Sequence, residues 1–176
     1  MTKKLLVLTG GARPNSVANN LLPIIERLVK NYADVSLDIA KAGELDLPFY
    51  DATTPPSAPG YEITNENVKA WSEQVASADA VIWLMPEYNH SITAVQKNAI
   101  DWLYQEWRDK PLGMIAYGFY EGKNVLMATD PIVGIIKPDV RAKTGLAISE
   151  HIDTEGMPLK EKLVEDRINS VIESLI

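Results

Sequence analysis

Two short polar segments of the sequence contain the residue types that bind charged or flat ligands. The first, residues 9–16, reads Thr-Gly-Gly-Ala-Arg-Pro-Asn-Ser. Its glycines let backbone amides approach a ligand closely, Arg13 supplies a cation and Ser16 supplies a hydroxyl. If a helix begins after Ser16, its unpaired amides also favour an anion. These features predict a phosphate site, and a plain turn with Ser16 as helix cap and a solvated Arg13 is an equally good interpretation.

The second polar segment, residues 86–91, reads Pro-Glu-Tyr-Asn-His-Ser and follows a strongly apolar run. Its backbone could hydrogen-bond the edge of a flat heterocycle, with apolar contact from Pro86 and Tyr88. The alternative is that Asn89 or Ser91 caps a helix while Tyr88 packs on the surface. We favour the ligand-binding interpretation of this segment.

Glu87 and His90 are the titratable side chains of the second segment. For Glu87 we expect one hydrogen bond to a ligand at the rim of a site rather than general acid–base catalysis. His90 has no evident carboxylate partner in the sequence, so we expect a solvated or structural side chain. No catalytic residue is assigned at either position.

The composition argues against several kinds of catalytic or metal site and against some binding partners. The 176 residues include no cysteine, which excludes disulfides, thiolate catalysis and zinc–thiolate centres. The only histidines, His90 and His151, cannot form a three-histidine metal site within one chain, and no metal site is predicted. A net charge of −7 opposes binding to nucleic acid or to an anionic membrane. The first polar segment matches neither the dinucleotide fingerprint nor the P-loop.

The length and hydropathy of the chain predict one domain over residues 1–176. A chain of this length suits a single sizeable core, and no run of about 18 apolar residues predicts a membrane span. The apolar run at residues 5–8 follows two lysines, but it is too short for a signal peptide and is typical of a buried strand. We therefore expect a cytoplasmic protein.

Strand and helix patterns alternate along the chain. Short apolar runs predict strands at residues 4–8, 35–40, 80–85, 111–117 and 146–151. Helical spacing of apolar residues predicts helices at residues 17–29, 64–77 with Thr64 as cap, 92–107, 123–136 with a break or kink at Pro131, and a last helix opened by Pro158. Residues 46–60 contain four prolines and are expected to form a loop.

This alternation predicts a parallel sheet with helices on both faces, the doubly wound α/β arrangement. In such sheets, ligands bind outside the carboxyl ends of the strands. The segments after the first, third and fourth strands, residues 9–16, 86–91 and 117–123, should therefore meet at one edge. The pattern alone does not identify the ligand.

The second polar segment is part of a longer set of motifs that resembles a known family. The motifs closely resemble those of the NADPH-dependent FMN reductase family, which includes quinone, chromate and azo-dye reductases. They are PEYNHSI from Pro86, KNAIDW from Lys97, KP from Lys110 and YG from Tyr117. The GGAR stretch from Gly10, with Ser16, is similar to the phosphate loop of that family. The resemblance covers roughly residues 4–118.

The resemblance implies a flavodoxin-like three-layer sandwich with strand order 2-1-3-4-5 and FMN as cofactor. The residues implied to hold the FMN phosphate are Gly11, Arg13, Ser16 and the amides of Val17 and Ala18. Those implied to lie against the isoalloxazine ring are Pro86, Glu87, Tyr88 and Asn89, with Tyr117 and Gly118 nearby. The family further implies NADPH or NADH as electron donor and a small-molecule acceptor. No protein nucleophile is needed, because the cofactor carries the chemistry.

The resemblance also implies a homodimer or a homotetramer. Family members commonly place the flavin ring near a subunit interface, to which the helix after the third strand contributes. Trp102, Tyr104 and Trp107 suit a buried contact there, although aromatic residues on a helix more often belong to the core of one chain.

The sequence departs from the family pattern at three places. Gly11 replaces the usual serine, which removes one hydrogen bond to the phosphate. Where the helix after the second polar segment begins, the family often has a proline, a small residue and a leucine before Lys97. This sequence has Thr93, Ala94 and Gln96 there. The segment at residues 119–121 stands where the family often has further glycine, so the rim that a second substrate crosses is altered. The last third of the chain matches only loosely.

Two other functions are compatible with this fold, because fold does not fix function. One is a flavodoxin-type electron carrier, which needs an acidic docking face that the net charge allows. The other is a flavin-free binding domain, which the glycine at position 11 favours. We favour an FMN-dependent NAD(P)H oxidoreductase over both.

Overall fold

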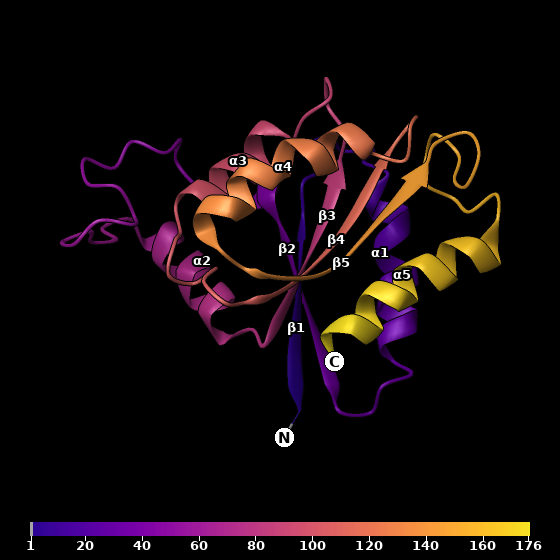
Figure 1. The fold of residues 1–176 in the computed structure, drawn as a ribbon, viewed down its shortest axis with the longest axis horizontal. Helices are drawn as coiled ribbons and strands as arrows, with labels where there is room; N and C mark the ends of the chain where they lie inside the picture. The colour runs from indigo at the N-terminus through magenta and orange to yellow at the C-terminus, as the bar shows by residue number, and fades with distance from the viewer. Residues whose placement is uncertain (1) are drawn as a thin grey trace.

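The computed structural model of the chain describes residues 2–176 as a five-stranded parallel sheet between two layers of helices (Figure 1). The strands are β1 Lys3–Thr9, β2 Val35–Lys41, β3 Ala80–Pro86, β4 Pro111–Gly118 and β5 Asp139–Ala147. The helices are α1 Ala18–Val29, the 3-10 turn η1 Ala42–Glu44, α2 Glu66–Ser77, α3 Ala94–Asp101, α4 Lys123–Ile136 and α5 Glu161–Leu175. The strand order β2-β1-β3-β4-β5 confirms the predicted three-layer arrangement. Within residues 2–176, none of these helices is both long enough and apolar enough to cross a membrane.

The order of the strands explains where a ligand can bind. The chain passes from β1 outward to β2 and then crosses back to β3 on the other side of β1. Ligands bind at the carboxyl edge where the strand order reverses in this way. The register pairs Thr9 with Leu84 and Pro86 with Tyr117, so the ends of β1, β3 and β4 lie side by side.

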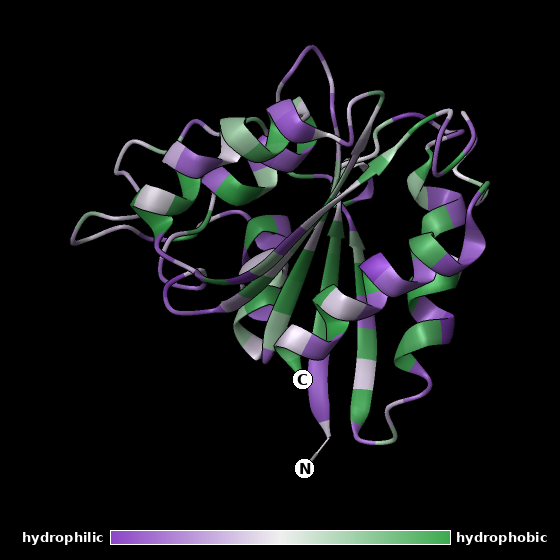
Figure 2. Ribbon diagram, turned by 45° about the vertical axis from the view of Figure 1, so that its right-hand side comes forward, coloured by the Kyte–Doolittle hydropathy of each residue, from purple (hydrophilic) through white to green (hydrophobic). Residues whose placement is uncertain are grey.

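Two apolar cores hold the layers together, one on each face of the sheet. Helices α1 and α5 cover one face, and α2, α3 and α4 cover the other (Figure 1). Alternate residues of β3 serve both cores, because Ile82 packs with α1 and α5 while Trp83 packs on the opposite face. All of β3 is buried, and apolar residues continue along the central strands in Figure 2. Burial of each valine, isoleucine, leucine or methionine side chain in β3 stabilises the fold by about 1.5–3 kcal/mol.

The aromatic residues after α3 belong to one of these cores. Trp107 is fully buried, and its ring centroid lies 5.6 Å from that of Trp83. Trp102 donates from Nε1 to the carbonyl of Pro48 at 2.8 Å. The interpretation of these two tryptophans as core residues of one chain is therefore confirmed. The predicted helix over residues 92–107 is too long, because the aromatic spacing continues past the end of α3 into turns.

The fifth strand was predicted at the wrong residues, 146–151, whereas β5 ends at Ala147. As an edge strand, β5 pairs only with β4 and leaves one side to solvent. Asp139, Arg141 and Lys143 are exposed, so no continuous apolar run marks the beginning of the strand. A search for apolar runs therefore finds only its buried end.

The starts of two helices and the interior of a third differ from the sequence prediction. Helix α2 is capped by Asn65 rather than Thr64, and the Asn65 side chain accepts hydrogen bonds from two first-turn amides at 2.9 and 3.2 Å. Helix α5 begins beyond Pro158. Helix α4 runs unbroken through Pro131, whose missing N–H leaves the carbonyl of the exposed Met127 open to water.

Candidate functional site

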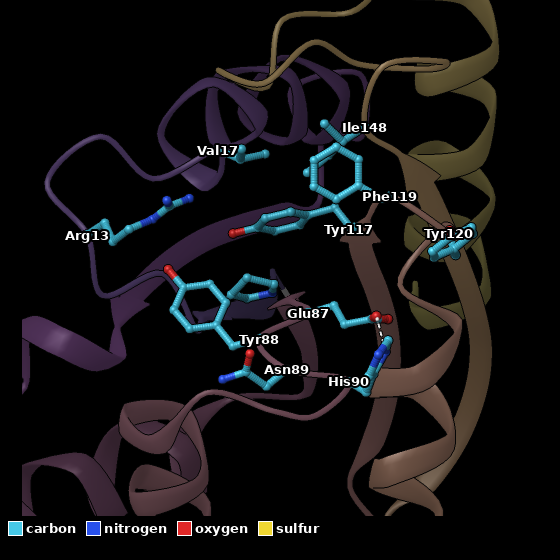
Figure 3. Close-up of a pocket in the computed structure, with 12 residues that line it drawn as sticks. Arg13, Val17, Glu87, Tyr88, Asn89, His90, Tyr117, Phe119, Tyr120 and Ile148 are labelled. Carbon is cyan, nitrogen blue, oxygen red and sulfur yellow. Dashed lines mark hydrogen bonds and ion pairs between the residues drawn. The ribbon is translucent and has the colours of Figure 1, made fainter.

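The segments that follow β1, β3 and β4 enclose a cavity of about 560 Å³ at the carboxyl edge of the sheet (Figure 3). Its lining residues are Arg13, Val17, Pro86, Glu87, Tyr88, Asn89, His90, Tyr117, Gly118, Phe119, Tyr120 and Ile148. The cavity therefore brings together the two polar segments and the end of β4. Gly11, Ser16 and Ala18 do not line it, but the Ser16 hydroxyl lies 3.4 Å from the hydroxyl of the lining residue Tyr117.

The segment after β3 is a tight two-residue hairpin. Tyr88 and Ser91 exchange both backbone hydrogen bonds, each at 3.0 Å. Between them Asn89 and His90 have φ values of 49° and 63°, the pattern of a type I′ turn. Asparagine and histidine are among the non-glycine residues that are enriched in this left-handed conformation. The turn fixes the direction in which Tyr88 leaves the backbone and faces the cavity.

The carboxylate of Glu87 caps helix α4. Its Oε2 accepts the backbone amides of Asn124 at 3.0 Å and Val125 at 3.3 Å, while Oε1 accepts the Asn124 side-chain amide at 2.9 Å. Gly122, at the N-cap position of α4, has no side chain to do this. Burial raises the pKa of Glu87, but the hydrogen bonds from Asn124, Val125 and His90 outweigh it and hold the pKa below its ordinary value. The carboxylate is therefore ionised and bound to α4 rather than free at the rim.

His90 has a carboxylate partner, contrary to the expectation from the sequence. Its Nδ1 lies 3.2 Å from Oε1 of Glu87 and 2.7 Å from the side-chain nitrogen of Asn124. Glu87 and His90 are three residues apart, and their side chains meet because the chain reverses direction at the turn. The ring is 74% exposed, so these contacts support the turn and do not form a buried acid–base pair.

The first polar segment presents a cation and a helix start at the other end of the cavity. Helix α1 begins after Val17, whose apolar side chain occupies the N-cap position and cannot accept a hydrogen bond. Ser16, one residue earlier, still supplies the side-chain oxygen of a cap, because its Oγ accepts the backbone amide of Ala18 at 3.4 Å. The exposed Arg13 guanidinium lies 5.7 Å from the centroid of the Tyr88 ring. This end of the cavity is positively charged and rich in hydrogen-bond donors.

Gly11 leaves room for the hydroxyl of Ser16. A Cβ at position 11 would lie 2.0 Å from the Ser16 Oγ and 2.8 Å from its Cβ. Those distances are far below van der Waals contact, so any larger residue at position 11 would displace the Ser16 side chain. The departure at Gly11 is therefore coupled to the position of Ser16.

Thr93 and Gln96, which differ from the family pattern, hold the end of β1 and the first polar segment in place. Thr93 Oγ1 donates to the carbonyl of Gly10 at 2.8 Å, and Gln96 Nε2 donates to the carbonyl of Leu8 at 3.2 Å. Both side chains are buried at the start of α3. Their polar character at a core position is the signal that could have identified this contact with the β1 end.

The rim of the cavity carries two exposed aromatic side chains. Phe119 is 67% exposed and Tyr120 is 71% exposed, and both line the cavity with Ile148 (Figure 3). Sequence analysis assigns these residues no site role beyond their departure from the family pattern. Exposed aromatic residues at the mouth of a cavity are the usual contacts of a flat ligand.

Comparison with known sequences gives matches over most of the chain. The family model of NADPH-dependent FMN reductase matches residues 3–151. An NAD(P)H-dependent FMN reductase of Schizosaccharomyces pombe is 30% identical over 140 residues, which cover 78% of this chain and 68% of that protein. A quinone reductase of Escherichia coli is 34% identical over 139 residues, which cover 77% of this chain and 64% of that protein.

Solved structures share the whole arrangement of the sheet and helices. FerB, a flavoenzyme NAD(P)H:(acceptor) oxidoreductase from Paracoccus denitrificans, superposes with a TM-score of 0.71 at 22% identity, over 99% of both chains. General stress protein 14 of Treponema denticola, in complex with FMN, gives a TM-score of 0.59 at 12% identity, over 98% of this chain and 97% of that chain. Likeness at these identities establishes the flavodoxin-like fold.

Proposed function

This chain belongs to the NADPH-dependent FMN reductase family, and on that premise we propose that it is an FMN-dependent NAD(P)H oxidoreductase. Its acceptor is a small molecule such as a quinone, a free flavin, an azo compound or chromate. The observation that carries the proposal is the two-ended character of the cavity, with an anion-binding end at α1 and an aromatic end beside β3 and β4. FMN has the same two ends, a phosphate and a flat ring system.

The donor set at the α1 end fits a phosphate. Arg13 contributes a cation and Ser16 a hydroxyl, and the amides of Val17 and Ala18 stand at the positive end of the helix dipole. The glycine at position 11 leaves the space that the Ser16 hydroxyl occupies. The phosphate would thus meet charge, hydroxyl and amide donors together.

The residues at the opposite end fit a flat ring. Pro86 and Tyr88 offer apolar contact, and the backbone of Glu87 and Asn89 is available to a ring edge. A Cβ at Gly118 would lie 3.0 Å from the Cβ of Glu87, so a larger residue there would have to displace the Glu87 side chain slightly. The wall beside the ring is therefore narrow and preorganised.

The chemistry that FMN supplies when bound is acceptance of a hydride from a nicotinamide and delivery of electrons to an acceptor. The protein binds and orients its partners. Arg13 and Ser16 hold the phosphate, and Glu87 keeps the hairpin turn in place through its contacts with α4. Phe119 and Tyr120 are available to a second substrate at the open rim. No side chain is assigned a nucleophilic role.

The experiment that tests this proposal uses the purified full chain. After loading with FMN and removal of excess, we expect flavin absorption in the visible spectrum. We also expect NADPH oxidation when a quinone is added to the protein alone. Turnover only in the presence of a partner reductase would instead identify an electron carrier. A colourless protein that fails to bind added FMN would indicate a flavin-free binding domain.

The proposal extends to assembly and location. Family membership supports a homodimer or a homotetramer of single-domain chains, located in the cytoplasm where NAD(P)H is available. The net charge of −7 argues against nucleic acid as a partner. Light scattering on a size-exclusion column measures the mass directly, and a monomer at micromolar concentration would contradict the predicted assembly.

A further inference from the structure

We propose that the hydroxyl of Tyr117 is a donor to the phosphate of the cofactor, completing an anion site that Gly11 cannot complete. This inference rests on the proposed binding of FMN. The family resemblance implies that Tyr117 lies near the isoalloxazine ring. We assign its hydroxyl to the phosphate, so that the residue contacts both the ring end and the phosphate end of the cavity.

The geometry of Tyr117 supports this assignment. The residue lies at the end of β4, with its side chain only 3% exposed. Its backbone carbonyl accepts the amide of Glu87 at 3.0 Å, which fixes the residue beside the hairpin segment. The side chain extends across the cavity beneath Val17, and its hydroxyl points toward Arg13 (Figure 3). The hydroxyl therefore reaches the start of α1, which lies on the far side of β3.

The hydroxyl of Tyr117 also has hydrogen-bonding capacity to spare. Its nearest polar partner is the Ser16 Oγ at 3.4 Å, longer than the 2.5–3.0 Å typical of a hydroxyl–oxygen hydrogen bond. Ser16 in turn lies 3.4 Å from the Ala18 amide. The Tyr117 hydroxyl, the Ser16 hydroxyl and the Ala18 amide are thus joined only by two long hydrogen bonds of 3.4 Å each. A phosphate oxygen placed among them would give each donor a proper acceptor.

The charge state of Tyr117 suits a donor to an anion. Burial raises its pKa to about 12, against a smaller opposing effect of the hydrogen bond from Ser16. The phenol is therefore protonated across the neutral and mildly alkaline range. A protonated phenol donates a hydrogen bond and adds no negative charge beside a phosphate.

Gly11 explains why a donor is needed from elsewhere. The Ser16 hydroxyl occupies the space that a side chain at position 11 would fill, at 2.0 Å from the Cβ position. A serine at position 11 cannot coexist with this placement of Ser16. The hydrogen bond missing at position 11 is therefore supplied across the sheet by Tyr117 instead.

The test compares FMN with riboflavin, which has the same ring but no phosphate. Dissociation constants are measured by flavin fluorescence titration for the wild-type chain and for Tyr117→Phe. We expect FMN affinity to fall about tenfold in the variant, the scale of one hydrogen bond to a charged group. Riboflavin affinity should stay within about twofold, because the phenyl ring is retained. The variant removes one oxygen, whose hydrogen bond to Ser16 is long at 3.4 Å. A thermal melt of the ligand-free chain checks that the variant folds.

The control is Tyr61→Phe, which removes a tyrosine hydroxyl that donates to the carbonyl of Trp102 at 2.8 Å, away from the cavity. It should change neither dissociation constant. Equal losses of FMN and riboflavin affinity in Tyr117→Phe, or no loss of either, would overturn the assignment of the hydroxyl to the phosphate. If the wild-type chain binds riboflavin and FMN equally weakly, there is no phosphate site and the inference is wrong. If it binds neither, the proposed function itself fails.

Discussion

The carboxylate of Glu87 and the first turn of α4 meet through Asn124, which donates both its backbone amide, at 3.0 Å, and its side-chain amide, at 2.9 Å. This contact joins the hairpin segment after β3 to the segment after β4. The Glu87 side chain, which lies outside any helix, thus connects the two walls of the cavity. Positioning of the ring-binding segment and stability of α4 should therefore change together.

Glu87→Gln tests this connection through stability. The glutamine keeps one acceptor oxygen, but its amide nitrogen then faces donor groups of Asn124 or the α4 backbone. We expect a loss of about 1–3 kcal/mol in the free energy of unfolding, measured by urea denaturation of the FMN-free chain. The exposed carboxylate Glu62 provides the control, and Glu62→Gln should leave the urea midpoint unchanged. Equal midpoints for both variants would contradict the capping role.

The same contact predicts a pH dependence of stability. Burial raises the pKa of Glu87, but hydrogen bonds from Asn124, Val125 and His90 outweigh it, so the folded-state pKa lies below the unfolded value of about 4.3. The stabilisation is then fully present above the unfolded pKa and is lost as pH falls through the folded pKa. Urea midpoints between pH 7 and pH 3 should fall less steeply for Glu87→Gln than for the wild type. Parallel curves would show that Glu87 does not contribute.

Arg13→Ala tests the cation of the phosphate end. Loss of one charge-assisted hydrogen bond should weaken FMN binding by about 1.5–3 kcal/mol in a flavin titration. Riboflavin binding should change far less, because the lost partner is the phosphate. Arg108, another exposed arginine outside the cavity, gives the matched control for overall charge. An unchanged FMN affinity in Arg13→Ala would remove Arg13 from the site.

His90→Ala tests whether the exposed ring takes part in the reaction. Its contacts with Glu87 and Asn124 support the turn, so we expect flavin reduction by NADPH to remain within a few-fold of the wild-type rate. Stopped-flow measurement of the flavin absorbance gives this rate directly. Slowing by about 10²-fold or more, the scale of general acid–base catalysis, would show that His90 acts in the chemical step.

The sequence predicted the central part of the fold because burial leaves a clear pattern there. Strands β1, β3 and β4 lie in the middle of the sheet, and their apolar runs identify them directly. Edge strand β5 carries polar residues on its exposed side and was therefore found only at its end. The aromatic spacing of Trp102 and Trp107 resembles a helical face and so predicts a helix where the chain forms turns.

The candidate site was predicted at the level of segments, because strand order alone brings three loops to one edge. The contacts between side chains depend on residues far apart in the sequence and leave no local pattern. Glu87 contacts Asn124 across 37 residues, and Ser16 approaches Tyr117 across 101 residues. The roles of individual residues toward FMN, NADPH or NADH stay predictions until binding is measured.

Phe119→Ala tests the aromatic rim as the place where the acceptor binds. The side chain is 67% exposed at the mouth of the cavity, so its removal should not disturb the core or the phosphate end. Loss of one aromatic contact costs about 0.5–1.5 kcal/mol, which corresponds to an increase of roughly two- to tenfold in KM for a quinone. The FMN dissociation constant and kcat should change little. Ile135, which is 69% exposed on α4 and does not line the cavity, gives a control of nearly equal exposure. If Phe119→Ala and Ile135→Ala give the same KM, or if Phe119→Ala weakens FMN binding instead, the rim does not select the acceptor.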